Sequence, residues 1–290
     1  MFQNIASLSD RIELSNGTSM PAFGLGVFLV SNDEAPATVR AAVSAGYRLI
    51  DTAAVYRNEA GTGEGIRDAL AENGLKREDL FVTSKLWNHS LSYEGTIAAY
   101  ERSLRLLGLD YLDLFLIHWP GTGSFEANWK ALEDLALAGA VKAIGVSNFH
   151  ARHLDELKRF ARVMPVVNQI ERHPELVQTD LLVRCREEKI VPQAWSPLMQ
   201  GAVLKHPVVL EMAERYGRSA AQIVLRWDLQ TDVALVVRST KIERLRENAD
   251  IFDFALTDED VARLNALHKG TRTGPDPETF DMNIGFSYEG

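Results

Sequence analysis

The chain contains a single cysteine, Cys185, among its 290 residues. One thiol cannot form a disulfide within the chain, and it cannot supply the paired cysteines of a structural zinc site. A chain without disulfides suits a reducing compartment, so we expect a cytoplasmic protein. The simplest interpretation of Cys185 is a small side chain packed within a helix over residues 180–188.

Several other signals are missing. No run of about 18 apolar residues exists, and the opening Met-Phe-Gln-Asn-Ile-Ala-Ser has no secretion-signal pattern, so we expect no membrane span and no export. The seven histidines are scattered without a His-Glu-x-x-His pattern, so we predict no metal site.

Positive charge is in deficit. The chain has 31 Lys and Arg against 40 Asp and Glu, giving a net charge of −9 and a pI of about 5.3. This balance argues against nucleic acid or an anionic membrane as the main partner. A small anionic ligand stays compatible, because local positive charge can override the global sign.

The composition is otherwise that of a globular protein, with 46% apolar and 24% charged residues. A length of 290 residues is usual for one α/β barrel. No repeat, low-complexity run or linker divides the chain, so we expect one domain over residues 1–290.

Short β-rich runs alternate with helical runs. Asn16-Gly17 predicts a tight hairpin near the N-terminus. Eight strands are predicted after it, at residues 22–27, 48–52, 80–85, 112–118, 143–147, 166–169, 191–195 and 235–238. Helices are predicted at residues 35–45, 61–73, 92–107, 125–138, 151–159, 178–188, 208–216, 220–229 and 256–267. The tail, residues 270–290, is predicted as a loop over one face.

Eight strands that alternate with helices predict a parallel sheet closed into a (β/α)8 barrel. The alternative is an open doubly wound sheet, which would require a Gly-x-Gly-x-x-Gly turn after the first strand. Gly24-Leu-Gly-Val-Phe lacks the third glycine and is not followed at once by a helix. The closed barrel is therefore favoured.

Polar residues stand where hydrophobic strands should end. Asp51, Lys85 and His118 close three predicted strands, and Tyr56 follows five residues after Asp51. Burying a charge is costly unless it is paired or used. In a (β/α)8 barrel the carboxyl ends of the strands meet at the face where active sites lie.

Together these four groups suit proton transfer to or from an oxygen. A tyrosine with a reference pKa of about 10 needs help to release its proton, and a neighbouring Lys ammonium supplies it. Asp51 can be the counter-charge for Lys85, and His118 can donate a hydrogen bond to a carbonyl oxygen. Ser147 and Ser196 have no evident Ser–His–Asp arrangement, which argues against acyl transfer.

Motifs over most of the chain resemble the aldo-keto reductase superfamily. They comprise Asp51-Thr-Ala-Ala-Val-Tyr56, Thr83-Ser-Lys85-Leu-Trp87, the run from Leu106 through Ile117-His118-Trp-Pro, Gly145-Val-Ser-Asn148-Phe, Val167-Asn-Gln169-Ile-Glu and Ala194-Trp195-Ser-Pro-Leu198. The resemblance implies a barrel that binds NADPH without a Rossmann domain. By the same resemblance Tyr56 is the general acid, Lys85 and Asp51 tune it, and His118 positions the carbonyl.

The resemblance also implies cofactor contacts. Ser147, Asn148 and Gln169 match positions that bind the nicotinamide carboxamide, and Trp195 matches the aromatic residue beneath that ring. Further matching cofactor positions are Val27, Phe28, Asp51, Ser196, Pro197, Leu198, Gln200 and Gly201. Met199 stands where the similar small bacterial branch, which includes 2,5-diketo-D-gluconate and methylglyoxal reductases, commonly has glycine.

The far end of the cofactor is expected near residues 237–248. Family members usually have Pro-Lys-Ser here, and this chain has Val237-Arg238-Ser239. Arg238 and Arg244 can grip a 2′-phosphate, which favours NADPH while NADH stays compatible. The remaining predicted contacts are Ser239, Thr240, Glu247 and Asn248.

The predicted reaction is NADPH-dependent reduction of aldehydes or ketones such as α-dicarbonyls and keto-sugars. The substrate pocket is expected to be lined by Phe28, Trp87, His118, Trp119 and Phe280. Two other functions stay open at this point: an NADPH-binding regulatory subunit with little turnover, and a Lys85 Schiff-base aldolase. Members of this family are often monomers, so we expect a monomer.

Overall fold

A closed barrel of eight parallel strands forms the centre of the protein. The computed structural model describes residue 2, residues 5–88 and residues 91–282. The strands follow one another in chain order, and the last pairs with the first. They are β3 (Phe23–Gly26), β4 (Leu49–Asp51), β5 (Phe81–Leu86), β6 (Leu112–Ile117), β7 (Val141–Ser147), β8 (Val167–Glu171), β9 (Val191–Trp195) and β10 (Ala234–Val237). The predicted (β/α)8 barrel is confirmed, and the open sheet is excluded.

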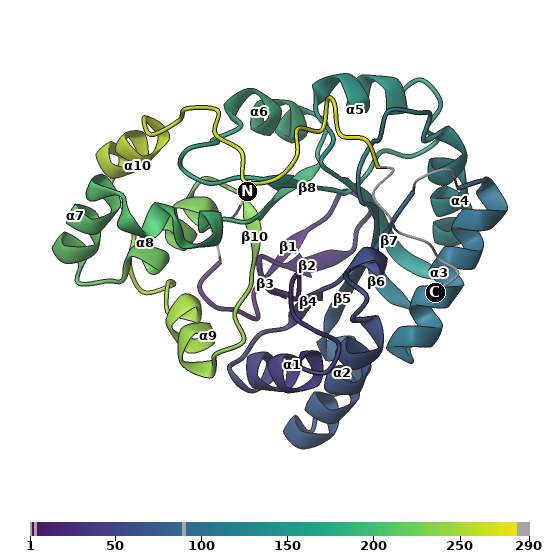
Figure 1. Ribbon diagram of the computed structural model, residues 1–290, viewed down its shortest axis with the longest axis horizontal. Coiled ribbons are helices and arrows are strands. Elements are labelled where there is room, and N and C mark those ends of the chain that lie inside the picture. The colour runs from purple at the N-terminus through teal and green to yellow at the C-terminus, as the bar shows by residue number, and fades with distance from the viewer. Residues whose placement is uncertain (1, 3–4, 89–90, 283–290) are drawn as a thin grey trace.

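Helices surround the strands (Figure 1). They are α1 (Ala35–Ser44), α2 (Glu59–Asn73), α3 (Tyr93–Leu107), α4 (Glu126–Leu137), α5 (Ala151–Leu157), α6 (Thr179–Glu187), α7 (Pro207–Tyr216), α8 (Ala220–Gln230), α9 (Ile242–Ala249) and α10 (Asp258–Asn265). Helix α9 is not among the segments predicted as helical. Half of its eight residues are charged, and it buries only Leu245 and Asn248.

The predicted hairpin is present as β1 (Arg11–Glu13) and β2 (Ser19–Pro21). Gly17 adopts a φ of 82° in the turn, which glycine accepts without strain. Asn16 donates to the carbonyl of Lys142 at the start of β7, and Met20 is fully buried. The hairpin therefore covers the end of the barrel where the strands begin. It leaves uncovered the opposite end, where the strands finish and where active sites lie in such barrels.

Helix α2 packs against the end of helix α3 at Gly63, where the two backbones are in close contact. A Cβ on Gly63 would lie 2.1 Å from the carbonyl oxygen of Leu107. We expect Gly63→Ala to destabilise the protein by about 1–3 kcal/mol in chemical denaturation, because backbone must move. Gly95→Ala in α3 is the control: its Cβ would meet a flexible Leu91 side chain at 3.2 Å, so its stability should change little or rise. Equal losses in both variants would contradict this packing argument.

Cys185 lies buried on α6, and burial raises the pKa of its thiol to about 12. The tail runs from α10 toward α5 without helix or strand through residue 282 (Figure 1), and residues 283–290 of the predicted loop lie outside the described residues. In the described part of the chain, no helix combines the length and apolarity needed to cross a membrane.

Candidate active site

The four polar residues singled out in the sequence lie together at the carboxyl end of the barrel. Asp51 ends β4, Lys85 lies near the end of β5, and His118 directly follows β6. Tyr56 ends a short 3-10 turn, η1 (Ala54–Tyr56), in the loop after β4. Neighbouring parallel strands bring these side chains to one mouth.

The ammonium of Lys85 is the centre of the cluster. Its side chain is fully buried, and its Nζ donates to Asp51 Oδ1 at 2.5 Å and to the carbonyl of Thr52 at 3.0 Å. The third partner is the Tyr56 hydroxyl, 3.4 Å away. These contacts satisfy all three ammonium protons and place positive charge beside the phenol.

Electrostatics keep Tyr56 protonated and Lys85 charged. Loss of solvent raises the pKa of the Tyr56 phenol, and the Lys85 charge opposes that rise. Burial lowers the pKa of Lys85, but Asp51 and Tyr56 outweigh it, so the pKa of the ammonium is raised. The pair therefore holds a proton on oxygen at neutral pH, with a cation ready to stabilise the phenolate once the proton leaves.

His118 faces the same mouth as a neutral imidazole. Burial and the Lys85 charge lower its pKa well below 6.5. Its ring lies 5.6 Å from the Tyr56 ring, edge to face. Its buried Nδ1 has no hydrogen-bond partner among the described residues. A neutral imidazole can donate one hydrogen bond to a substrate oxygen without competing with Tyr56 as the acid.

Aromatic side chains wall the mouth. The Phe28 ring lies 5.0 Å from Tyr56, and Trp87 lies 5.6 Å from His118. Phe280, from the tail, packs 4.5 Å from Trp119. The structure thus places Phe28, Trp87 and Trp119 against Tyr56 or His118, and Phe280 against the two tryptophans. Phe28 remains 51% exposed, so this side of the wall is open to solvent.

Four predicted cofactor residues form a hydrogen-bonded layer next to the cluster. Gln169 Nε2 donates to Asp51 Oδ2 at 2.8 Å, and Ser147 Oγ donates to the Gln169 carbonyl at 2.8 Å. Trp195 Nε1 donates to Asn148 Oδ1 at 2.8 Å. Asn148 Nδ2 donates in turn to the His118 carbonyl at 3.0 Å. The layer ties β7, β8 and β9 to the ends of β4 and β6.

The other predicted cofactor residues lie in loops around the same mouth. Val27 and Phe28 follow β3, and Val27 N–H donates to the Asp51 carbonyl at 3.0 Å. Ser196, Pro197, Leu198, Gln200 and Gly201 follow β9. Arg238, Ser239, Thr240, Arg244, Glu247 and Asn248 follow β10 and continue into α9. No described contact joins this last group to the four polar residues, so it forms a separate cationic rim.

The loops at this end adopt unusual backbone angles. Residues other than glycine with positive φ include Leu29 at 58°, Asn148 at 64°, Ser196 at 54°, Met199 at 49° and Gln200 at 53°. Such left-handed conformations cost free energy and gather at functional sites. The positive φ of Met199 is one that glycine adopts without strain, which is compatible with the glycine that the family resemblance implies here.

Two positioning residues, Asn58 and Gln193, are not identified from the sequence. Asn58 Nδ2 bonds the carbonyls of Val27 and Val30, and its Oδ1 accepts from Thr52. Gln193 accepts from Gln169 Nε2 at 2.7 Å inside the barrel. A glutamine inside the buried run Val191-Pro-Gln-Ala-Trp195 is the signal that could have revealed it, because buried polar groups need partners.

Barrel and site define the class of protein: residues 14–269 match the model of the aldo/keto reductase family, and the chain belongs to that family. It is therefore an oxidoreductase of the aldo-keto reductase type, as the sequence predicts.

Individual proteins with similar sequences or structures are consistent with this family. An uncharacterized oxidoreductase of Bacillus subtilis (strain 168), YtbE, is 53% identical over 95% of this chain and 99% of its own length. Glyoxal reductase of the same organism is 52% identical over 94% of this chain and 98% of its own length. A solved structure of a Gox0644 mutant in complex with NADPH is 39% identical, covers 94% of this chain and 99% of its own, and superposes with a TM-score of 0.88.

Proposed function

We propose that the enzyme reduces aldehydes and α-dicarbonyls, with keto-sugars as further candidates, and that Tyr56 donates the proton. The observation that carries the proposal is the Tyr56 hydroxyl 3.4 Å from the buried Lys85 ammonium, with His118 beside it. The relative named glyoxal reductase supports the dicarbonyl class. The aromatic wall of Trp87, Trp119 and Phe280 supports substrates with an apolar part.

Each group has one step to perform. His118 donates a hydrogen bond to the carbonyl oxygen and fixes its direction. A nicotinamide held by Ser147, Asn148, Gln169 and Trp195 would supply the hydride for the carbonyl carbon. Tyr56 then gives its proton to the alkoxide, and Lys85 stabilises the phenolate that remains. Asp51 keeps Lys85 charged and in place.

The cofactor is proposed to lie between two groups of residues: the hydrogen-bonded layer that contains Gln169, and the cationic rim after β10. Ser147, Asn148, Gln169 and Trp195 suit the nicotinamide end, since amide and hydroxyl groups stand there beside a half-buried indole. Exposed Arg238 and Arg244 suit a 2′-phosphate, which makes NADPH the preferred form.

The exposed guanidinium of Arg244 allows a direct test of this preference. We expect Arg244→Ala to raise the Kd for NADPH about tenfold to a hundredfold, the cost of a charge-assisted hydrogen bond, while the Kd for NADH changes by less than about twofold. Fluorescence titration with both cofactors measures the difference. Arg246→Ala, two residues along α9 and on another face, is the matched control and should spare both. Equal weakening of NADPH and NADH by Arg244→Ala would remove the 2′-phosphate assignment.

Two rival functions are weighed against the same geometry. A Lys85 aldolase would need a neutral amine, but the pKa of this ammonium is raised and its protons face three acceptors. A regulatory subunit would bind NADPH and turn over slowly. A screen of NADPH oxidation across methylglyoxal, aromatic aldehydes, keto-sugars and keto-steroids tests the proposal, and no turnover on any of them would favour the subunit.

We further propose that the 290 residues work as one domain, as a monomer, in the cytoplasm. The single buried thiol and the net charge of −9 are compatible with that setting.

A further inference from the structure

The carboxylate of Glu171 has no role in the proposed reaction, yet it is fully buried at the barrel mouth. It ends β8, two residues after Gln169, so the two side chains point to the same side of the strand. Gln169 reaches Asp51, and Glu171 lies one layer farther out. A buried carboxylate needs several donors to offset the lost solvation.

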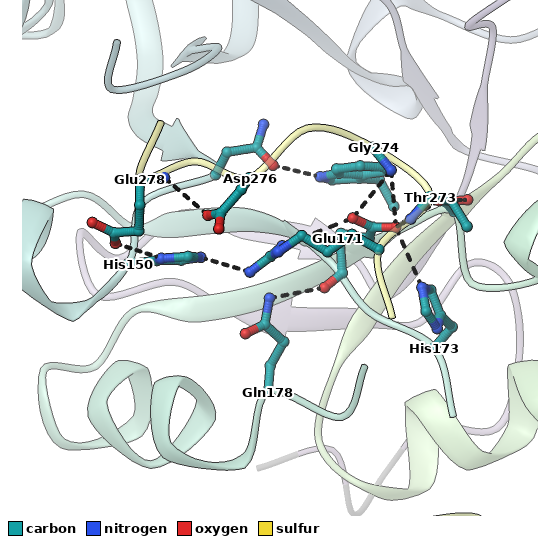
Figure 2. Close-up of polar contacts among 12 residues, drawn as sticks. His150, Glu171, His173, Gln178, Thr273, Gly274, Asp276 and Glu278 are labelled. Carbon is teal, nitrogen blue, oxygen red and sulfur yellow. Dashed lines mark hydrogen bonds and ion pairs between the residues drawn. The ribbon is translucent and has the colours of Figure 1, made fainter. Parts of the chain in front are cut away.

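Those donors come from the tail. We call residues 270–282 the C-terminal strap. Glu171 Oε1 accepts from the Thr273 N–H at 2.5 Å, from the Thr273 hydroxyl at 2.5 Å and from the Gly274 N–H at 3.3 Å. His173 Nε2 lies 3.3 Å away and Arg272 lies 3.8 Å from Oε2. Figure 2 shows Glu171 between its strand and the strap, with Thr273 and Gly274 above it.

A second fastening point lies farther along the strap. Glu278 Oε1 lies 2.6 Å from His150 Nδ1, and Glu278 also pairs with Arg152. His150 Nε2 lies 3.1 Å from Arg272, so one imidazole joins both ends of this stretch of the strap (Figure 2). Glu278 is about one-third exposed, whereas Glu171 is fully buried, so the Glu171 contact is the better shielded from water.

The strap forms part of the proposed substrate wall. A Cβ on Gly274 would lie 2.5 Å from the Trp195 ring, so the backbone there rests on the indole. Six residues later Phe280 packs on Trp119, and Met282 joins the same cluster with Trp87. The placement of these side chains depends on where the strap is held.

We propose that Glu171 is a positioning residue for substrate binding, which fastens the C-terminal strap and thereby holds Phe280 against Trp119 at the mouth. The consequence for catalysis rests on the proposed function, whereas the fastening itself does not. Since Glu171 does not touch the proton-transfer groups, its loss should affect substrate affinity and leave the chemical step nearly intact.

The test compares Glu171→Ala, Glu171→Gln and a control, Glu175→Ala. Glu171→Ala should raise KM for an aromatic aldehyde tenfold or more, with kcat and the Kd for NADPH within about twofold. Hydrogen exchange of the Thr273 and Gly274 amides should accelerate at least tenfold. Glu171→Gln keeps an acceptor oxygen and should recover much of both. Glu175 pairs with Lys269, the residue before the strap, and its side chain bonds that of Thr271, away from the substrate wall. Its loss should therefore change KM and the exchange of the Thr273 and Gly274 amides far less than the loss of Glu171.

A double-mutant cycle separates fastening from general damage. Thr273→Val keeps the N–H bond to Glu171 and removes the hydroxyl, which bonds Glu171 and also lies 3.3 Å from Ser196 Oγ, so it should raise KM and exchange less than Glu171→Ala. In the Glu171→Ala background its effect should be clearly smaller than in the wild type. If the Glu171→Ala variant does not fold, the Thr273→Val variant tests the proposal by itself. An unchanged KM in Thr273→Val would then overturn the proposal.

Two other results would also overturn it: wild-type exchange of the strap in folded Glu171→Ala, or fast exchange with an unchanged KM. Failure of the proposed function is distinct, because it would appear as turnover surviving in Tyr56→Phe while the strap exchanges as in wild type.

Discussion

Tyr56→Phe should lower kcat by about a thousandfold, within the range that a positioned general acid contributes, while the Kd for NADPH changes by less than about twofold. The substitution removes one oxygen and leaves the ring that packs against Phe28 and His118. It therefore deletes the proton donor without opening a cavity. Steady-state kinetics with methylglyoxal and fluorescence titration of NADPH measure the two effects.

Tyr93→Phe is the matched control. Its hydroxyl bonds Asp134 between α3 and α4, outside the barrel mouth, so kcat should stay within about twofold. Wild-type turnover in Tyr56→Phe would refute its role as acid.

The pH profile provides a second check on Tyr56. The phenol is the acid, its pKa is raised by loss of solvent, and it works only while protonated. Reduction should therefore persist through neutral pH and fall only on the alkaline side, above the ordinary tyrosine pKa of about 10. A loss of activity on crossing pH 7 upward would point to a different acid.

The second large effect is expected at Lys85. Lys85→Met leaves Asp51 buried without its cation, and an uncompensated buried charge costs about 3–5 kcal/mol in the free energy of unfolding. Activity should fall by about a hundredfold or more, because nothing then stabilises the phenolate. Denaturant titration and turnover assays report the two losses separately.

The double variant Asp51→Asn with Lys85→Met should recover much of the stability, since it leaves no buried charge, and none of the activity. Lys130→Met serves as the surface control. Lys130 and Glu126 form an equally short pair at 2.5 Å, but their side chains are 50% and 45% exposed, so its loss should cost less than about 1 kcal/mol. If Lys85→Met were as stable as this control, Asp51 would not depend on Lys85 for its charge balance.

Much of the barrel is predictable from local pattern. Each strand is a short run of buried side chains that is followed by a helix. The order of strands and helices along the chain is enough to place Asp51, Lys85 and His118 at one end of the barrel. The family resemblance adds Tyr56 and the loop residues. Helix α9 is missed because residues 237–248 are interpreted as a contact for the cofactor, and half of the helix is charged.

Contacts between distant segments are harder to predict. Glu171 and Thr273 lie 102 residues apart, and no spacing rule relates the end of a strand to a loop without periodicity. The same holds for the Gln169 bond to Asp51, across 118 residues. Phe280 is named from the sequence as a pocket residue, but its 4.5 Å packing on Trp119 depends on how the strap is fastened. Distances and pKa directions likewise need the fold.

The burial of Cys185 and the protonation of Lys85 have a shared consequence for chemical durability. Thiolates and neutral amines attack reactive carbonyl compounds, so an enzyme that binds such compounds risks being modified by them. The pKa of the only thiol is raised to about 12, so almost no thiolate exists at neutral pH. The Lys85 amine is held as ammonium and is not nucleophilic. Neither Cys185 nor Lys85 is therefore present in its nucleophilic form when the enzyme binds the carbonyl compounds that it is proposed to reduce.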